Sequence, residues 1–254
     1  MSYSANPVIL CFRPRPAARL RLLCFAYAGG SAAVFRDWAM ELEDVEVHAV
    51  AYPGRAHRLH SSMPEHLDEL VREVAAAAGG LTQQGAWSVY GHSFGALLGF
   101  EVIRALCALG AAAPRRLIAA ARAAPHIALP GARAHQLSDG ELLELLERHF
   151  TADPLLRNRE LVQTLLPTLR ADLRLSETTV LPLAAKIDVP ITAWGGTRDA
   201  TVGEADLEAW AVHTTQEFNI EMIEGGHLFL RETPAVTLRK VATRVLADLD
   251  EVRR

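Results

Sequence analysis

Short apolar segments with the character of β-strands alternate along this chain with longer segments that repeat hydrophobic residues at helical spacing. Several of the apolar segments are continuously hydrophobic, as is typical of strands covered on both faces. This alternation predicts the α/β class, with a mostly parallel central sheet flanked by helices. We expect strands over 8–13, 21–27, 45–51, 86–90, 116–121, 191–194 and 218–224, and helices over 33–42, 66–77, 94–109 and 234–249.

The length and charge of the chain exclude several function classes. A chain of 254 residues can bury a substantial core as one domain. A net charge of −4 gives no electrostatic footprint for nucleic acid. The apolar run at 8–12 is too short for a signal peptide or a membrane span. Cys11, Cys24 and Cys107 lack metal-ligand spacing, so we expect no metal and a reducing, cytoplasmic location.

One interval, residues 126–185, departs from the alternation and is predicted to be an inserted helical segment. Ser138 and Glu141 fit a capping box at the start of a first helix. The pair at 153–154, Asp-Pro, offers a second helix start. A further helix is expected from 159 towards 178, kinked or split at Pro167. Such an insertion is usually a lid or a substrate wall, and additional scaffold helices are the alternative.

The first helix of this insertion carries an apolar stripe. Leu142, Leu145, Leu146 and Phe150 recur at helical spacing. A stripe of this kind must face the core, a substrate pocket or a partner.

The segment GHSFG at 91–95 places a serine between two glycines where a predicted strand passes into a predicted helix. A serine at such an elbow takes a strained backbone conformation, and glycines beside it lack the Cβ atoms that would collide with the strand and helix. The elbow would present the Oγ of Ser93 above the sheet, at a helix N-terminus that favours developing negative charge. The pattern predicts that Ser93 is a nucleophile, and a tight structural turn is the alternative.

A serine nucleophile needs a base, and the base needs a group that orients it. In α/β-hydrolases the chain order is serine, acid, histidine. Asp199 and His227 each follow an apolar segment that ends in a glycine pair, so both lie at carboxyl ends of strands, where α/β sheets place their sites. Asp206, in a helical segment, and Glu224, in a strand, are the rival acids. His92 is expected to be packed or bonded to the backbone.

A tetrahedral oxyanion needs two backbone N–H donors. One should be the amide of Phe94, the residue after the serine. The other should come from the loop at 28–30, Ala-Gly-Gly, which follows an earlier strand. An ordinary tight turn is the alternative for these glycines.

The chain resembles the type II thioesterases, freestanding editing hydrolases of nonribosomal peptide and polyketide synthases. The resemblance covers nearly the whole chain and keeps the order and spacing of the family's motifs. It implies an α/β-hydrolase fold, a triad of Ser93, Asp199 and His227, and oxyanion donation by the amides of Ala28 and Phe94. It also implies that the insertion is a mobile lid over an acyl pocket. The matching segments are FAYAGGSAAVFRDW, AYPGRAHR, YGHSFGALLGFE, ARAAPH, LLPTLRADLRLSET, WGGTRD and GGHLFL.

The same resemblance implies the reaction. It is hydrolysis of acyl or aminoacyl thioesters from the phosphopantetheine arm of carrier proteins, by a monomer without metal or redox cofactor, in siderophore or antibiotic biosynthesis. A carboxylesterase or lipase with the same triad is the alternative, because a fold does not fix a substrate. A binding protein on a hydrolase scaffold is a third possibility.

Two residues depart from the family's pattern. Ala26 stands where the family usually has proline, and Tyr52 stands where it usually has leucine; both flank motif loops.

Overall fold

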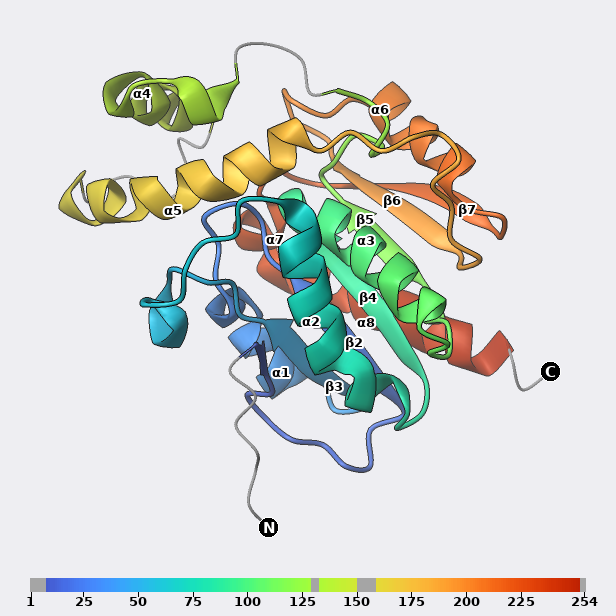
Figure 1. Cartoon of the computed structure of the whole chain (residues 1–254). Helices are drawn as coiled ribbons and strands as arrows, with labels where there is room; N and C mark the ends of the chain where they lie inside the picture. Colours follow the sequence, from blue (N-terminus) through green and yellow to red (C-terminus); the bar gives the residue numbers. More distant parts are fainter. Residues whose placement is uncertain (1–7, 129–132, 150–158, 252–254) are drawn as a thin grey trace.

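A seven-stranded sheet forms the centre of the molecule in the computed structural model, which describes residues 8–128, 133–149 and 159–251 (Figure 1). Its strand order is β1-β3-β2-β4-β5-β6-β7. Strands β2 to β7 are mutually parallel, and only β1 runs antiparallel, against β3. The strands are β1 (Ile9–Leu10), β2 (Leu20–Phe25), β3 (Val45–Val50), β4 (Trp87–His92), β5 (Leu117–Ala120), β6 (Ile191–Gly196) and β7 (Phe218–Ile223).

Every predicted strand is present, which confirms the α/β class. The first is the shortest, since only two residues of the segment at 8–13 pair with β3. The central strands β2, β4, β5 and β6 are buried along their whole length, which explains why their sequences are continuously apolar.

Helices cover both faces of the sheet. Helices α2 (Leu67–Thr82) and α3 (Phe94–Ala108) pack against each other on one face, and α8 (Pro234–Glu251) lies on the other (Figure 1). The predicted helix at 33–42 is divided into a 3-10 turn at Ala32–Phe35 and α1 (Arg36–Glu41). Two short helices, α6 (Glu204–Glu208) and α7 (Phe229–Glu232), follow β6 and β7. None of the helices in the described ranges combines the length and apolar character needed to cross a bilayer.

The described part of the interval between β5 and β6 contains two α-helices and no strand, as predicted: α4 (Asp139–His149) and α5 (Arg159–Thr178). The capping box is present, because the amide of Ser138 donates to Glu141 Oε2 over 2.8 Å and the amide of Glu141 donates to Ser138 Oγ over 3.3 Å. The expected helix start at 153–154 lies outside the described residues. The sequence predicted a kink or a split at Pro167; the split is wrong, since α5 runs as one helix through this residue, and the kink stays a prediction. A proline removes one amide from the ladder, and a long helix can keep its other hydrogen bonds.

Helices α4 and α5 form a hydrophobic cluster of their own, separate from the core of the sheet. Its buried members include Leu142 of α4 and Val162 and Leu166 of α5. Leu145 and Leu146 pack against the same cluster, so the α4 stripe faces α5. Phe150, the last member of the predicted stripe, lies outside the described residues.

Candidate active site

The serine elbow joins β4 to α3. Ser93 has φ 54° and ψ −115°, a left-handed conformation that a non-glycine residue rarely adopts. A Cβ atom on Gly91 would lie 2.3 Å from the carbonyl oxygen of Gly95, and one on Gly95 would lie 2.3 Å from that of Phe25. Both glycines are therefore required by close backbone approach, for the reason that the sequence indicated.

The elbow, the loop after β6 and the loop after β7 bring three predicted site residues together. His227 Nε2 lies 2.9 Å from Ser93 Oγ. On the other side of the ring, His227 Nδ1 lies 2.8 Å from Asp199 Oδ2. A hydroxyl, an imidazole and a carboxylate thus form one hydrogen-bonded row, with Ser93 only partly buried and accessible to a substrate.

The carboxylate of Asp199 has a full set of donors. Its Oδ1 accepts hydrogen bonds from the amide of Thr201 (2.8 Å), the hydroxyl of Thr201 (2.7 Å) and the amide of Val202 (3.2 Å). Burial by itself would raise the pKa of Asp199, but the hydrogen bond and charge of His227, together with Thr201, lower this pKa to about 2. The carboxylate is therefore ionised at neutral pH, which favours a proton on Nδ1 of His227 and leaves Nε2 free to accept one from Ser93.

The two rival acids are engaged elsewhere. Asp206 Oδ2 accepts the amide of Gly203 over 2.9 Å and caps helix α6. The Glu224 side chain is 76% exposed and lies 3.8 Å from Arg198. Thr201 is a contributor that sequence reasoning missed, although its place two residues after Asp199 fits an Asx turn.

His92, inside the elbow, is completely buried and bonded to the backbone, as predicted. Its Nε2 lies 2.7 Å from the carbonyl oxygen of His227, and its Nδ1 lies 3.0 Å from the hydroxyl of Tyr90. Because a carbonyl oxygen can only accept, Nε2 carries the proton and Nδ1 accepts from Tyr90. Burial, followed by the charge of His227, lowers the pKa of His92 to about 3, so this ring stays neutral.

The two predicted oxyanion donors are both available. Phe94 begins α3, where a helix leaves its first amides without intrahelical acceptors. Ala28 precedes Gly29, which has φ +76°, in a turn closed by the Gly30 amide on the Tyr27 carbonyl (2.8 Å). Within the described part of the chain, neither the Ala28 nor the Phe94 amide donates to a protein acceptor.

The two departures from the family pattern are in contact with each other. The hydroxyl of Tyr52 donates to the carbonyl oxygen of Ala26 over 2.8 Å. The ring of Tyr52 also meets that of Phe94 edge to face, with centroids 5.7 Å apart. A tyrosine at this position therefore ties the end of β2 to the first residue of α3, which a leucine could not do by hydrogen bonding.

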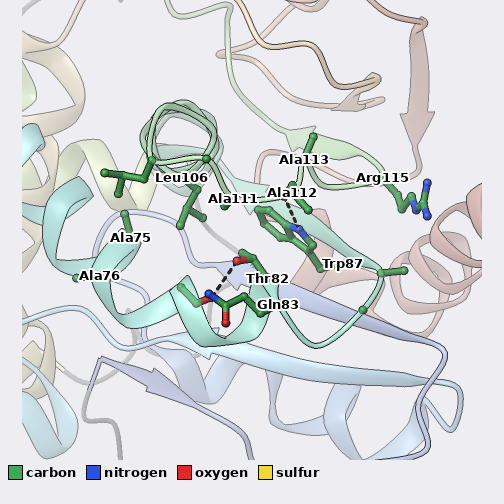
Figure 2. Close-up of a pocket in the computed structure, with 15 residues that line it drawn as sticks. Ala75, Ala76, Thr82, Gln83, Trp87, Leu106, Ala111, Ala112, Ala113 and Arg115 are labelled. Atoms are coloured by element: carbon green, nitrogen blue, oxygen red, sulfur yellow. Dashed lines mark hydrogen bonds between the residues drawn. The ribbon is translucent and has the colours of Figure 1, made fainter.

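An open cavity of about 910 Å³ lies between α2 and α3 (Figure 2). Its lining includes Ala75, Thr82, Trp87, Leu106 and Arg115. Trp87 begins β4, whereas the elbow follows the other end of that strand. The cavity is therefore at the opposite end of the sheet and plays no part in the site.

Residues 20–245 match the family model described as "Thioesterase domain". This chain belongs to the thioesterase family. Over 223 residues it is 35% identical to "Thioesterase PikA5" of Streptomyces venezuelae, which covers 87% of this chain and 79% of that protein.

Two solved thioesterases share the fold closely. The RedJ thioesterase of the prodiginine pathway in Streptomyces coelicolor is 34% identical, with a TM-score of 0.82 over 97% of this chain and 90% of its own. The type II thioesterase BorB of the borrelidin biosynthetic cluster is 31% identical, with a TM-score of 0.83 over 96% and 98%. The fold of this thioesterase is accordingly the α/β-hydrolase fold, and its activity is hydrolysis of thioesters.

Proposed function

We propose that this thioesterase removes aberrant or stalled acyl and aminoacyl groups from the phosphopantetheine arm of carrier proteins in nonribosomal peptide or polyketide biosynthesis. The observation that carries the chemistry is the row of Ser93, His227 and Asp199, with contacts of 2.9 and 2.8 Å. The similarity to BorB and RedJ, both of which belong to biosynthetic pathways, supports the substrate class over that of a generic esterase.

In the proposed mechanism Ser93 Oγ attacks the thioester carbonyl while His227 Nε2 takes its proton. Asp199 holds the imidazole in the required tautomer and stabilises the imidazolium. The amides of Ala28 and Phe94 donate to the tetrahedral oxyanion. Collapse of this intermediate expels the thiolate of the arm, which takes the proton from His227. A water molecule, deprotonated by His227, then attacks the acyl-serine, and the carboxylic acid leaves as Ser93 regains its proton.

We assign the helical interval 126–185 as a lid subdomain within a single hydrolase domain, 1–254. Helices α4 and α5 project over one end of the sheet, above the carboxyl ends of the strands that carry the site (Figure 1). A lid at this position would wall the entrance for a long pantetheine arm. The arm arrives on a transient carrier-protein partner. Because Ser93, His227 and Asp199 supply the nucleophile, the base and the orienting acid, the proposed reaction needs neither metal nor redox cofactor. All three residues come from one chain, so a monomer suffices.

The cytoplasm is the proposed compartment. The described cysteines Cys11, Cys24 and Cys107 are all free thiols. Free thiols are typical of a reducing environment, where disulfides rarely persist.

The test compares one acyl group on three carriers: a phosphopantetheinylated carrier protein, coenzyme A and p-nitrophenol. We expect kcat/KM to be highest for the carrier protein. A preference for the p-nitrophenyl ester would favour the alternative, a small-molecule carboxylesterase or lipase. Ranking a panel of carrier proteins with different acyl groups would then identify the preferred substrate.

A further inference from the structure

A buried ion pair joins helix α5 to the loop that carries Ala28. The guanidinium of Arg55 donates to both carboxylate oxygens of Asp172, each over 2.7 Å. The side chain of Arg55 is 6% exposed and that of Asp172 is 2% exposed. The two residues lie 117 positions apart, Arg55 in the loop after β3 and Asp172 in α5.

Both partners of this pair also bind the backbone immediately after Ala28. Asp172 Oδ2 accepts the amide of Gly29 over 2.8 Å. Arg55 Nη1 donates to the carbonyl oxygen of Gly30 over 2.9 Å. One amide and one carbonyl of the turn are therefore fixed by opposite charges that are themselves held together.

Tyr52 connects the same pair to Phe94. The Arg55 guanidinium lies over the Tyr52 ring, 5.2 Å from its centroid, and this ring packs edge to face on Phe94. The Tyr52 hydroxyl holds the Ala26 carbonyl. The loop around Ala28 is thus held on both sides, at residue 26 and at residues 29 and 30.

We propose that Arg55 and Asp172 are positioning residues for the oxyanion site, and that the geometry of this site depends on the seating of helix α5. The inference rests on the proposed function, because it takes the Ala28 amide as an oxyanion donor. Helix α5 supplies Asp172 and also Leu169, whose Cδ1 would lie 3.1 Å from a Cβ on Gly29. Displacing α5 would remove the acceptor of the Gly29 amide and leave the Arg55 charge buried without its partner.

Burial of the pair favours a positional role over a purely stabilising one. Taking two charges out of water consumes much of their attraction, so a buried ion pair is a poor source of net stability. The two parallel hydrogen bonds between the guanidinium and the carboxylate, by contrast, fix the relative orientation of the two groups as well as their distance. A loop that must present an amide to a developing negative charge requires this directional constraint.

The molecule contains a matched control in the Arg116–Asp248 pair. Arg116 Nη2 lies 2.7 Å from Asp248 Oδ1, and both residues are buried. Asp248 belongs to α8, on the face of the sheet opposite α3. Arg116 also donates to Glu217 Oε2 over 2.9 Å, so it keeps one carboxylate partner when Asp248 is replaced. Breaking the Arg116–Asp248 contact should therefore lower stability without touching the oxyanion loop.

The experiment compares Asp172→Asn with Asp248→Asn, with an acyl-carrier protein as the substrate. The concentration of active sites is measured by titrating Ser93 to completion with a fluorophosphonate, and kcat is expressed per active site. We expect Asp172→Asn to lower kcat per site about tenfold to hundredfold with KM changed less than about threefold. Asp248→Asn should lower the thermal midpoint and keep kcat per site within about threefold of wild type. A normal kcat per site in Asp172→Asn, or an equal loss in Asp248→Asn, would overturn the inference.

Arg55→Lys provides a second test if Asp172→Asn does not fold. Lysine keeps the charge but cannot donate two parallel hydrogen bonds to the carboxylate, so Arg55→Lys should lower kcat per site at least about fivefold. An unchanged kcat would count against the positioning role of the pair.

The wild-type enzyme separates this inference from the proposed function. If wild type hydrolyses no acyl-carrier thioester, the proposed function fails, whereas an active wild type with normal variants refutes the positioning role alone.

Discussion

His92 donates a hydrogen bond from Nε2 to the carbonyl oxygen of His227, 2.7 Å away. The residue before the elbow serine therefore holds the backbone of the histidine that receives the serine's hydrogen bond. Since Tyr90 fixes the other nitrogen of His92, the elbow strand β4 positions both ends of the Ser93–His227 contact.

Replacing the elbow serine should abolish turnover and leave the fold intact. Ser93→Ala removes an Oγ atom that contributes little packing, and we expect kcat to fall at least about 10³-fold with an unchanged thermal midpoint. Ser88→Ala is the matched control, because Ser88 lies buried in β4, the strand that leads into the elbow, and its Oγ has no hydrogen-bond partner among the described residues. Activity of Ser93→Ala within tenfold of wild type would remove this serine as the nucleophile.

Asp199→Asn should lower kcat by roughly 10³ to 10⁴ while the protein stays folded. The amide cannot hold the same imidazole tautomer, although it preserves the shape of the carboxylate. Asp206→Asn is the control, since Asp206 caps α6 and should affect stability alone. Steady-state kinetics of the two variants decide the assignment, and the reverse result would make Asp206 the acid.

Acid should destabilise the protein through His92. The folded pKa is lowered to about 3, whereas an unfolded histidine titrates near 6.5. Between these values the unfolded chain binds a proton that the folded chain excludes, so stability falls as pH falls through this window, by up to about 1.4 kcal/mol per pH unit. Asp199, with a folded pKa of about 2 and an unfolded value near 3.9, contributes stability that is lost only at lower pH.

The measurement is urea unfolding of wild type and His92→Gln from pH 7 to pH 4. Glutamine keeps a donor for the His227 carbonyl but does not titrate, so its free energy of unfolding should depend less steeply on pH. Parallel curves for the two proteins would show that His92 does not titrate differently in the folded and unfolded states.

Leu142→Ala should loosen α4 while leaving the sheet unchanged. Leu142 is fully buried in the α4–α5 cluster, and its truncation costs about 2 to 5 kcal/mol at such a site. Amide exchange in α4 should accelerate, whereas fluorescence of Trp87 and Trp194 in the main core should report an unchanged unfolding midpoint.

The kinetics of Leu142→Ala test the lid. If α4 shapes the entrance, KM for the acyl-carrier protein should rise while p-nitrophenyl ester hydrolysis stays within about twofold of wild type. An alanine scan from 137 to 175 extends the comparison. Activities on carrier, coenzyme A and p-nitrophenyl substrates that all scale with thermal stability would make these helices scaffold.

The sequence predicted those parts of the fold and site that local pattern determines. The order of strands and helices follows from periodicity, and the GHSFG elbow follows from the need for glycine beside Ser93. The row of Ser93, His227 and Asp199 could be anticipated because each residue follows the carboxyl end of a strand, and these ends lie on the same side of a parallel sheet.

Apart from Thr201, which contacts Asp199 two residues away, what sequence reasoning missed depends on contacts between distant segments. The Arg55–Asp172 pair spans 117 positions, and neither residue is marked by its neighbours as buried. The surface that the α4 leucines contact could be identified only once the position of α5 was known. A helical period shows that a face is apolar, but it does not show which surface that face meets.

The separation of the two hydrophobic clusters has an evolutionary consequence. Because α4 packs on α5 and outside the core of the sheet, substitutions on α4 can accumulate without weakening the scaffold that holds Ser93, His227 and Asp199. Under the proposed lid role, selection acting on α4 would change which acyl chains are accepted while the hydrolytic chemistry stays constant. A chimera that receives α4 from a relative should therefore inherit that relative's substrate range and retain its own turnover machinery.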